Sequence, residues 1–361
     1  MVDERLNPAT AADARSDETG ATARRAGAQV DRRALLVATA AAAAGGLVAY
    51  PWLRRRRAAR ASVFLAAGQR YDGPLEQTIR DGLSAVGFDA AAIRGRRVLL
   101  KPNLVEPHRD APHLTTHPAV VTAAAAVFRD CGAEVVVGEA PGHLRDTELA
   151  LDESGLASAL NEERLPFADL NYEEVRGVKN VGRVSRLQTI FLPRSVLEAD
   201  LIVSMPKLKT HHWVGLTAAM KNLYGVLPGI KYGWPKNVLH HAGIPQTVVD
   251  IAATVPRTIA IVDGILAMEG DGPIMGTPKP LGLLAVSDNL AAIDATCARI
   301  IGLEPTRVSY LRLAKGRLGP LAERDIQQRG EAWQSLAAPF ALLDLPHLNH
   351  LRSAEAGIRT S

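Results

Sequence analysis

The segment 204–229 carries the residue types best suited to chemistry in this chain. Its lysines, Lys207, Lys209 and Lys221, are cations that hold phosphate or carboxylate groups, and His211 can bind a metal or transfer a proton near neutral pH. These side chains adjoin an apolar strand-like run and lack the spacing of an amphipathic helix. We therefore expect the segment to face an anionic ligand, a metal-bearing cofactor, or both.

A sheet is needed to bring such residues together. Apolar runs that read as strands alternate with helix-like segments from residue 62 onward. Strands are expected at 62–67, 97–100, 133–138, 200–205, 257–263 and 281–287, and helices at 75–86, 118–128, 289–301 and 308–315. This alternation predicts an α/β fold, a mainly parallel sheet with helices on both faces. The more charged residues 142–195 are expected to form a small α+β insertion.

Polar residues follow four of the predicted strands, where open α/β sheets bind ligands. They begin at Lys101, Glu139, Pro206 and Asp263. The candidate residues for binding an anion or cofactor are Lys101, Asn103, Lys207, Lys209, Lys221 and Asn222. Lys207 and Lys209 are two residues apart, so a continuing strand would place both on one face, where two cations need an anion. The alternative is that these lysines are solvated charges at strand ends.

Two pairs of adjacent histidines, His211-His212 and His240-His241, lie about thirty residues apart. Adjacent histidines seldom point the same way, so one from each pair is expected to face a common site. His211, His240 and His241 are the candidates for proton transfer, and one histidine from each pair with a carboxylate would also suit a metal.

Three acids lie among three glycines from the end of the strand 257–263 to Pro273. Asp263, Glu269 and Asp271 are the candidate metal ligands, although their spacing is not that of a calcium loop. The alternative is a glycine-rich turn with solvated acids. Asp294 lies in an apolar helix, so it needs a cation or the backbone amides of that loop as a partner.

The amino terminus reads as a leader. Residues 1–30 have few large apolar side chains and are expected to be disordered, whereas 31–61 contain Arg32-Arg33 before an uncharged run and resemble a twin-arginine signal or a membrane anchor. The twin-arginine export machinery is then a partner, and the protein is periplasmic or otherwise outside the cytoplasm. The domain boundaries that follow are an α/β body at 62–320 and a peripheral segment at 321–361.

Charge and cysteine content exclude two classes of protein. Residues 1–61 hold 11 of the 42 Lys and Arg residues and 6 of the 38 Asp and Glu residues, which leaves 31 basic against 32 acidic residues in the body. A neutral body argues against nucleic acid as a partner. The chain has two cysteines, which cannot ligate an iron–sulfur cluster of the ordinary four-thiolate kind.

The motifs together resemble the uncharacterised family called domain of unknown function 362 over residues 62–320. The resemblance lies in Leu100 to Leu104, Glu139 to Gly142, Pro206 to His211, Ala219 to Gly225, and Asp263-Gly264 with Glu269 to Pro273. It implies an α/β fold and, in some members, a fused iron–sulfur module. This chain lacks the cysteines for such a module, so a separate iron–sulfur protein is a possible partner.

A more distant likeness is to the nickel-pincer lactate racemases. It follows the order Lys-Pro-Asn, then Lys221, Pro228-Gly229 and His240 or His241. It implies a phosphate-bearing organometallic cofactor held by lysines, with histidines as proton carriers.

The function expected from these residues is that of an exported enzyme. It would bind an anionic substrate or a phosphate-bearing cofactor and carry out redox or racemase-type chemistry. The alternative is a periplasmic anion-binding protein without catalysis, or a partner subunit of an iron–sulfur protein.

Overall fold

The computed structural model describes residues 61–143 and 145–353. The expected leader at 1–30 and the twin-arginine segment at 31–61 lie outside the described residues, except for Ala61, which begins the first strand. Within the described ranges, no helix combines the length and apolar character that crossing a membrane requires.

The described residues form a mixed sheet of ten strands. In order across the sheet these are β12 (Ile326–Gly330), β1 (Ala61–Ala66), β11 (Thr277–Ser287), β10 (Thr258–Glu269), β7 (Leu201–Met205), β2 (Arg97–Pro102), β3 (Glu134–Glu139) and β4 (Phe167–Asp169), with β8 (Lys207–His211) beside β10 and β9 (Gly215–Thr217) beside β8. Strands β4, β3, β2, β7 and β10 run parallel, as do β8 with β10 and β1 with β12. Strand β11 is antiparallel to β1 and β10, and β9 is antiparallel to β8. The predicted α/β class with a mainly parallel sheet is confirmed.

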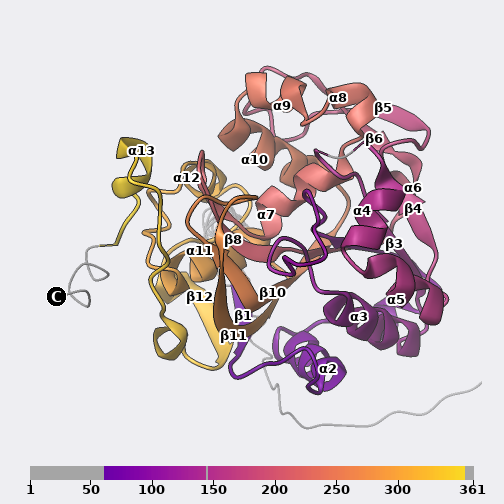
Figure 1. The fold of residues 1–361 in the computed structure, drawn as a ribbon, viewed down its shortest axis with the longest axis horizontal. Coiled ribbons are helices and arrows are strands. Elements are labelled where there is room, and N and C mark those ends of the chain that lie inside the picture. The colour runs from indigo at the N-terminus through magenta and orange to yellow at the C-terminus, as the bar shows by residue number, and fades with distance from the viewer. Residues whose placement is uncertain (1–60, 144, 354–361) are drawn as a thin grey trace, which may run out of the picture. The chain divides into compact units, whose positions relative to one another are not determined.

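Both faces of the sheet are buried, which explains why its central strands read as continuous apolar runs. In β2, Val98 and Leu100 join one hydrophobic cluster, while Leu99 joins the other. The first cluster packs under α2 (Leu75–Ala85) and α3 (Pro118–Asp130). The second packs under α7 (Ala219–Asn222), α10 (Ile244–Thr254), α11 (Leu290–Ile300) and α12 (Ser309–Ala314). Figure 1 shows α2 and α3 on one side of β10 and β11, with α11 and α12 on the other.

The insertion at 142–195 contains helices and a hairpin, as expected. Helices α4 (Thr147–Glu153) and α5 (Leu156–Glu162) are followed by β4, which joins the main sheet, and by the hairpin of β5 (Val175–Lys179) and β6 (Thr189–Pro193). The remaining short elements are η1 (Ala91–Ile93), α6 (Arg194–Glu198), η2 (Leu223–Val226), α8 (Gly229–Tyr232), α9 (Asn237–His241), η3 (Glu323–Asp325), η4 (Trp333–Leu336) and α13 (Pro346–Asn349).

Strand β10 continues beyond the position at which a loop was expected. The chain does not leave the sheet at Asp263 but pairs with β11 as far as Glu269, with a shift of register between Gly264 and Leu266. The apolar residues 266–268 explain the continuation, because they are stabilised by pairing with 278–280. Only the residues after Glu269 form a turn, so Asp263 and Asp271 are held by different structures.

The segment 321–361, expected to be peripheral, contributes to the body. Strand β12 pairs with β1 from Ala61 to Leu65 and forms an edge of the main sheet. Phe340, Leu348 and Leu351 are buried in the same hydrophobic cluster as α11 and α12. The boundary at residue 320 is therefore not a boundary of the packed core.

Candidate functional site

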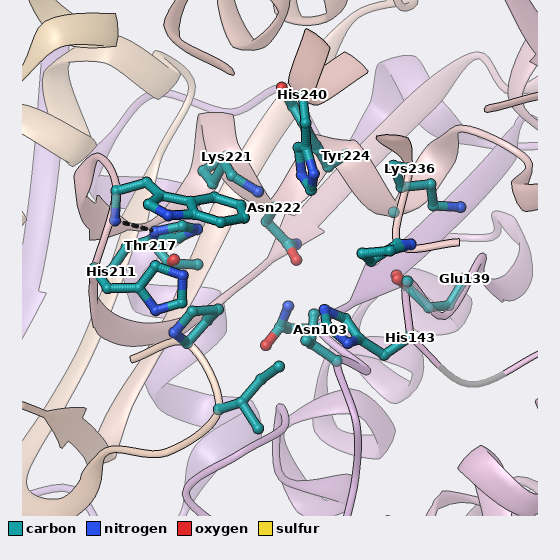
Figure 2. A pocket seen from close by; sticks show the side chains of 18 of the residues that line it. Asn103, Glu139, His143, His211, Thr217, Lys221, Asn222, Tyr224, Lys236 and His240 are labelled. Atoms are coloured by element: carbon teal, nitrogen blue, oxygen red, sulfur yellow. Dashed lines mark hydrogen bonds between the residues drawn. The ribbon is translucent and has the colours of Figure 1, made fainter. Parts of the chain in front are cut away.

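A cavity of about 310 Å³ lies where the ends of β2 and β3 meet the segments that follow β8 and β9 (Figure 2). Its position agrees with the rule that α/β sheets bind ligands beyond the carboxyl ends of their strands. The side chains around it are cationic, aromatic and histidine-rich. The residues discussed below that line it are Lys101, Asn103, Glu139, His143, His211, His212, Trp213, Thr217, Lys221, Asn222, Tyr224, Gly225, Lys236 and His240.

A buried ion pair between Lys101 and Glu139 forms one wall. The Lys101 ammonium contacts the Glu139 carboxylate and also donates to Asn222 Oδ1 (3.0 Å) and to its neighbour's carbonyl, Pro102 O (2.7 Å). Burial raises the pKa of Glu139 to about 7 and lowers the pKa of Lys101, and each charge opposes the shift of the other. A Cβ atom at Gly225 would overlap both charged groups, so only glycine leaves room for this pair.

Asn222 is also held at both ends of its amide. Its Nδ2 donates to Lys101 O (3.1 Å) and to Ser204 Oγ (3.1 Å), and the Ser204 hydroxyl donates to Ala219 O (2.9 Å). Asn222 therefore ties α7 to the ends of β2 and β7, and its amide is fully occupied by the protein.

Of the three lysines that line the cavity, Lys221 is the one that bonds to no carboxylate or carbonyl oxygen among the described residues. Its ammonium lies over the Tyr224 ring, 3.9 Å from the centroid, and makes neither an ion pair nor a hydrogen bond with any described residue. Removal from water, with the Lys101 charge nearby, lowers the pKa of Lys221 to about 7. In Figure 2 the Lys221 nitrogen points toward the interior of the cavity.

Asp294 fixes the short helix that carries Lys221. Its carboxylate, completely buried on α11, accepts hydrogen bonds from Ala219 N (2.7 Å), Met220 N (3.1 Å) and the Tyr310 hydroxyl (3.0 Å). The need of Asp294 for a partner was expected, but its partners are the amides of α7 and not those of the 263–273 loop. Four residues are too few to form a stable helix unaided, so this carboxylate is what orders the first turn.

Lys236 and Glu139 also line the cavity; the sequence did not mark Lys236, and it marked Glu139 only as the start of a polar strand end and not as a catalytic, cofactor-binding or metal-binding candidate. Lys236, in a left-handed conformation (φ 69°), is buried and donates to Leu227 O and Asn171 Oδ1 (3.3 Å). Burial lowers the pKa of Lys236 to about 7. No local pattern marks Lys236. Glu139 carried a signal, because an acid that ends a buried strand beside Lys101 requires a cation.

Two of the three candidate catalytic histidines reach the cavity. His211 is almost completely buried, and its Nδ1 accepts from Trp213 N (3.1 Å), which leaves the proton of the neutral ring on Nε2. The His240 ring lies between Trp213 and Tyr224, with centroids at 5.2 and 6.2 Å. Burial and the Lys221 charge lower the pKa of His211 far below its usual value and that of His240 to about 4. Both rings are therefore neutral at pH 7, whereas the third candidate, His241, is exposed and does not line the cavity.

Lys207 and Asp263 form a separate buried pair that does not line the cavity. Lys207 Nζ donates to Asp263 Oδ2 (2.6 Å) and to the Tyr71 hydroxyl (2.8 Å), while the other Asp263 oxygen accepts from Tyr71 (3.0 Å). The register of β8 and β10 places these two residues opposite each other. The anion expected for Lys207 is thus supplied by the protein itself.

Lys209 is buried without a carboxylate, and its ammonium donates to Leu114 O (2.6 Å) and Pro273 O (3.2 Å). It lies behind the turn that lines the cavity, not on the cavity surface. Burial lowers its pKa strongly, and the Lys207, Lys221 and Lys101 charges act in the same direction. Lys209 therefore supports the turn at Pro273.

The three candidate metal ligands do not converge. Asp263 pairs with Lys207, Glu269 with Lys279 (3.1 Å), and Asp271 approaches His212 Nδ1 (3.2 Å). Across the part of the chain that the structure describes, no three His, Cys, Asp or Glu side chains are grouped to hold a metal ion. The described side chains alone therefore do not fit a protein-ligated metal.

The family match spans residues 98–299, more than half of the chain, and it is to the domain of unknown function DUF362. The chain belongs to the DUF362 family. Every residue that lines the cavity lies within the matched range.

Two comparisons place this DUF362 protein among known chains. A thylakoid-associated protein of Synechocystis sp. is 31% identical over 265 residues, which cover 72% of this chain and 79% of that protein. The lactate racemase apoprotein from Thermoanaerobacterium thermosaccharolyticum matches at 14% identity with a TM-score of 0.36, over 55% of this chain and 50% of that one. The match therefore spans about half the length of the racemase structure.

Proposed function

We propose that this DUF362 protein is an enzyme that binds a small carboxylate or phosphate in the cavity and transfers protons to and from it through His211 and His240. The unpartnered Lys221 ammonium is the observation that carries the proposal. Lys221 is half-buried, and a cation partly withdrawn from water is unfavourable unless an opposite charge faces it. Lys101 has Glu139 and Lys236 has two carbonyl-type oxygens, but Lys221 faces only an aromatic ring.

The histidines support catalysis over simple binding. A neutral imidazole accepts a proton at one nitrogen and donates from the other, and acid–base catalysis needs this capacity beside the bound ligand. His211 presents its protonated Nε2 side, while no described residue bonds to the His240 ring nitrogens. An imidazole N–H can also bind an anion without turnover, so catalysis is tested separately from binding.

The proposed ligand could be the phosphate group of a cofactor, and the proposal concerns only the binding of that anionic group. Lysines of the cavity would hold its phosphate, and any metal that came with it would need most of its ligands from the cofactor. The binding of the anion is therefore tested without assuming a metal.

Anion binding is tested by calorimetric titration with phosphate, glycerol 3-phosphate, glycolate and pyruvate at pH 6.5. The Lys221→Met variant should bind at least tenfold more weakly than the parent protein, because a charge-assisted contact is lost. Lys231→Met is the matched control, since Lys231 also lies over an aromatic ring, Phe191, but is exposed and outside the cavity. Equal binding by the Lys221→Met variant would contradict the proposal.

Catalysis is tested separately by deuterium incorporation from D2O into pyruvate, whose methyl protons are acidified by the carbonyl group. The parent protein should accelerate the exchange, and His240→Gln should reduce it while anion binding persists. Exchange at the uncatalysed rate with normal binding would favour the non-catalytic anion-binding alternative.

We also propose that the protein acts outside the cytoplasm, after export by the twin-arginine machinery. Arg32-Arg33 before an uncharged run supports this location. The thylakoid association of the Synechocystis relative is compatible with a membrane-bounded compartment. Fractionation of cells expressing the protein with Arg32-Arg33 changed to Lys-Lys should show its retention in the cytoplasm.

A further inference from the structure

We propose that the ligand of the cavity carries a hydroxyl group beside its anionic group, and that Asn103 and Thr217 recognise this hydroxyl. The inference rests on the proposed anion binding and specifies the class of ligand. It comes from two polar atoms in the cavity wall, Asn103 Oδ1 and Thr217 Oγ1, that are buried and have no hydrogen-bond partner among the described residues.

The backbone of Asn103 is fixed by hydrogen bonds, but its side-chain oxygen has no hydrogen-bond donor among the described residues. Its N–H donates to Thr116 Oγ1 (2.8 Å) and its carbonyl accepts from Thr116 N (3.0 Å), while the residue is 3% exposed. A buried amide oxygen without a donor is unfavourable, so a donor is expected to reach it when the site is filled. Figure 2 shows the Asn103 amide at the wall of the cavity, on the side opposite Lys221.

Thr217, on strand β9, likewise has a fixed backbone and a buried side-chain oxygen without a hydrogen-bond partner among the described residues. Strand β9 fixes its backbone opposite Lys209 on β8, and the residue is 4% exposed. The Thr217 hydroxyl both donates and accepts, whereas Asn103 Oδ1 only accepts, so a ligand hydroxyl would donate to Asn103 and could bond to Thr217 in either sense. An anion without a hydroxyl, such as acetate, would occupy Lys221 but would leave these atoms unsatisfied.

The neighbouring polar side chains, unlike Asn103 and Thr217, have their hydrogen-bond partners within the protein. Asn222 and Lys101 saturate each other, and Lys236 is bonded to Asn171 and Leu227. Asn103 Oδ1 and Thr217 Oγ1 thus join Lys221 and the two imidazoles as cavity groups that are free to bond a ligand. A bound water is the competing partner for Asn103 and Thr217, and it would serve them equally well with any anion.

Matched pairs of anions distinguish a ligand hydroxyl from a water. Dissociation constants are measured for glycolate against acetate and for glycerol 3-phosphate against propyl phosphate, which differ in hydroxyl content but not in charge. The parent protein should prefer the hydroxyl-bearing member of each pair by about tenfold, the factor expected for one well-placed hydrogen bond. The preference should fall close to one in Thr217→Val and Asn103→Leu.

The control variant is Thr210→Val. Its hydroxyl lies outside the cavity and donates to Gly270 O (2.9 Å), so its loss should leave the preference unchanged. Equal affinities within each pair for the parent protein, or a preference that survives in both Thr217→Val and Asn103→Leu, would overturn the inference while leaving anion binding intact. Failure of every anion to bind, or binding that Lys221→Met does not weaken, would instead remove the proposed function on which the inference rests.

Discussion

Lys207 and Lys221 lie 14 positions apart in the chain and differ in what faces the ammonium group. Lys207 meets the Asp263 carboxylate, whereas Lys221 meets the Tyr224 ring and the cavity. The sequence predicted cationic chemistry for both, because both lie in the lysine- and histidine-rich segment 204–229 beside an apolar run. It could not show that β10 would place Asp263 opposite Lys207, since that pairing joins residues 56 positions apart.

Substitution of the two lysines should therefore affect stability in opposite ways. Lys207→Met leaves a buried carboxylate without its cation and should lower the free energy of unfolding by about 3 kcal/mol. Lys221→Met removes an unpaired cation and should change it by less than about 1 kcal/mol or stabilise the protein. Urea unfolding of both variants measures the difference. Equal destabilisation would mean that Lys221 has a structural partner.

The other residues of the cavity also divide into those that the sequence marks locally and those whose position depends on distant contacts. Strand ends and paired histidines are visible in the sequence, and the candidates Lys101, Asn103, His211 and His240 that were chosen from them line the cavity, as does Asn222. Lys236 was missed because its position depends on a buried contact with Asn171, 65 positions away.

At the level of elements, α7 depends on a residue far away in the sequence. The sequence predicted the longer helices and the central strands from their apolar periodicity, but a four-residue helix gives no such signal. Its first amides are bound by Asp294 of α11, 74 or 75 positions away. The length of β10 was likewise missed, because Gly264 and the following acids are typical of a turn until the pairing with β11 is known.

The role of Asp294 is tested with a pair of variants that act on the same carboxylate. Asp294→Asn should lower the free energy of unfolding by about 2 kcal/mol, because an amide presents a donor to one of the α7 N–H groups. It should also weaken anion binding several-fold, because α7 carries Lys221 and Asn222. Tyr310→Phe removes one hydrogen bond to Asp294 without touching α7, so it should cost about 1 kcal/mol and leave anion affinity unchanged. Unaltered affinity in folded Asp294→Asn would contradict a positioning role.

For the whole molecule, the main difference from expectation is the carboxyl-terminal segment. The polar residues of β12 suggested a peripheral tail, yet this strand covers the edge of β1, and Phe340 is 1% exposed. The side chains of β12 are exposed or half-buried, so this edge strand is polar although its backbone pairs with β1, which is why composition did not predict it.

Removal of residues 321–361 should therefore destabilise the whole protein. It would expose the β1 edge and the apolar surface beneath Leu336, Phe340, Leu348 and Leu351. The truncated protein should unfold at a lower urea concentration or aggregate, and Phe340→Ala alone should cost about 3 kcal/mol. A truncated protein with the unfolding midpoint of the full chain would show that this segment is peripheral after all.

The central claim is that Lys221 binds an anionic ligand. The pH titration of the Lys221 side chain tests this claim most directly. The pKa of Lys221 is lowered to about 7 in the ligand-free cavity, so the side chain is mostly neutral above that pH. An anion favours the charged form, so binding must raise this pKa, take up a proton above pH 7, and weaken as pH rises. Glu139, whose pKa is also raised to about 7, becomes negative over the same range and disfavours the anion further.

We would follow the Lys221 Cε resonance by NMR in lysine-labelled protein from pH 5 to 11, assigned with Lys221→Met, with and without glycerol 3-phosphate. The account predicts a midpoint near 7 without the ligand and a clear upward shift when it is added. A midpoint at the ordinary lysine value of 10.5 that does not respond to the anion would contradict it.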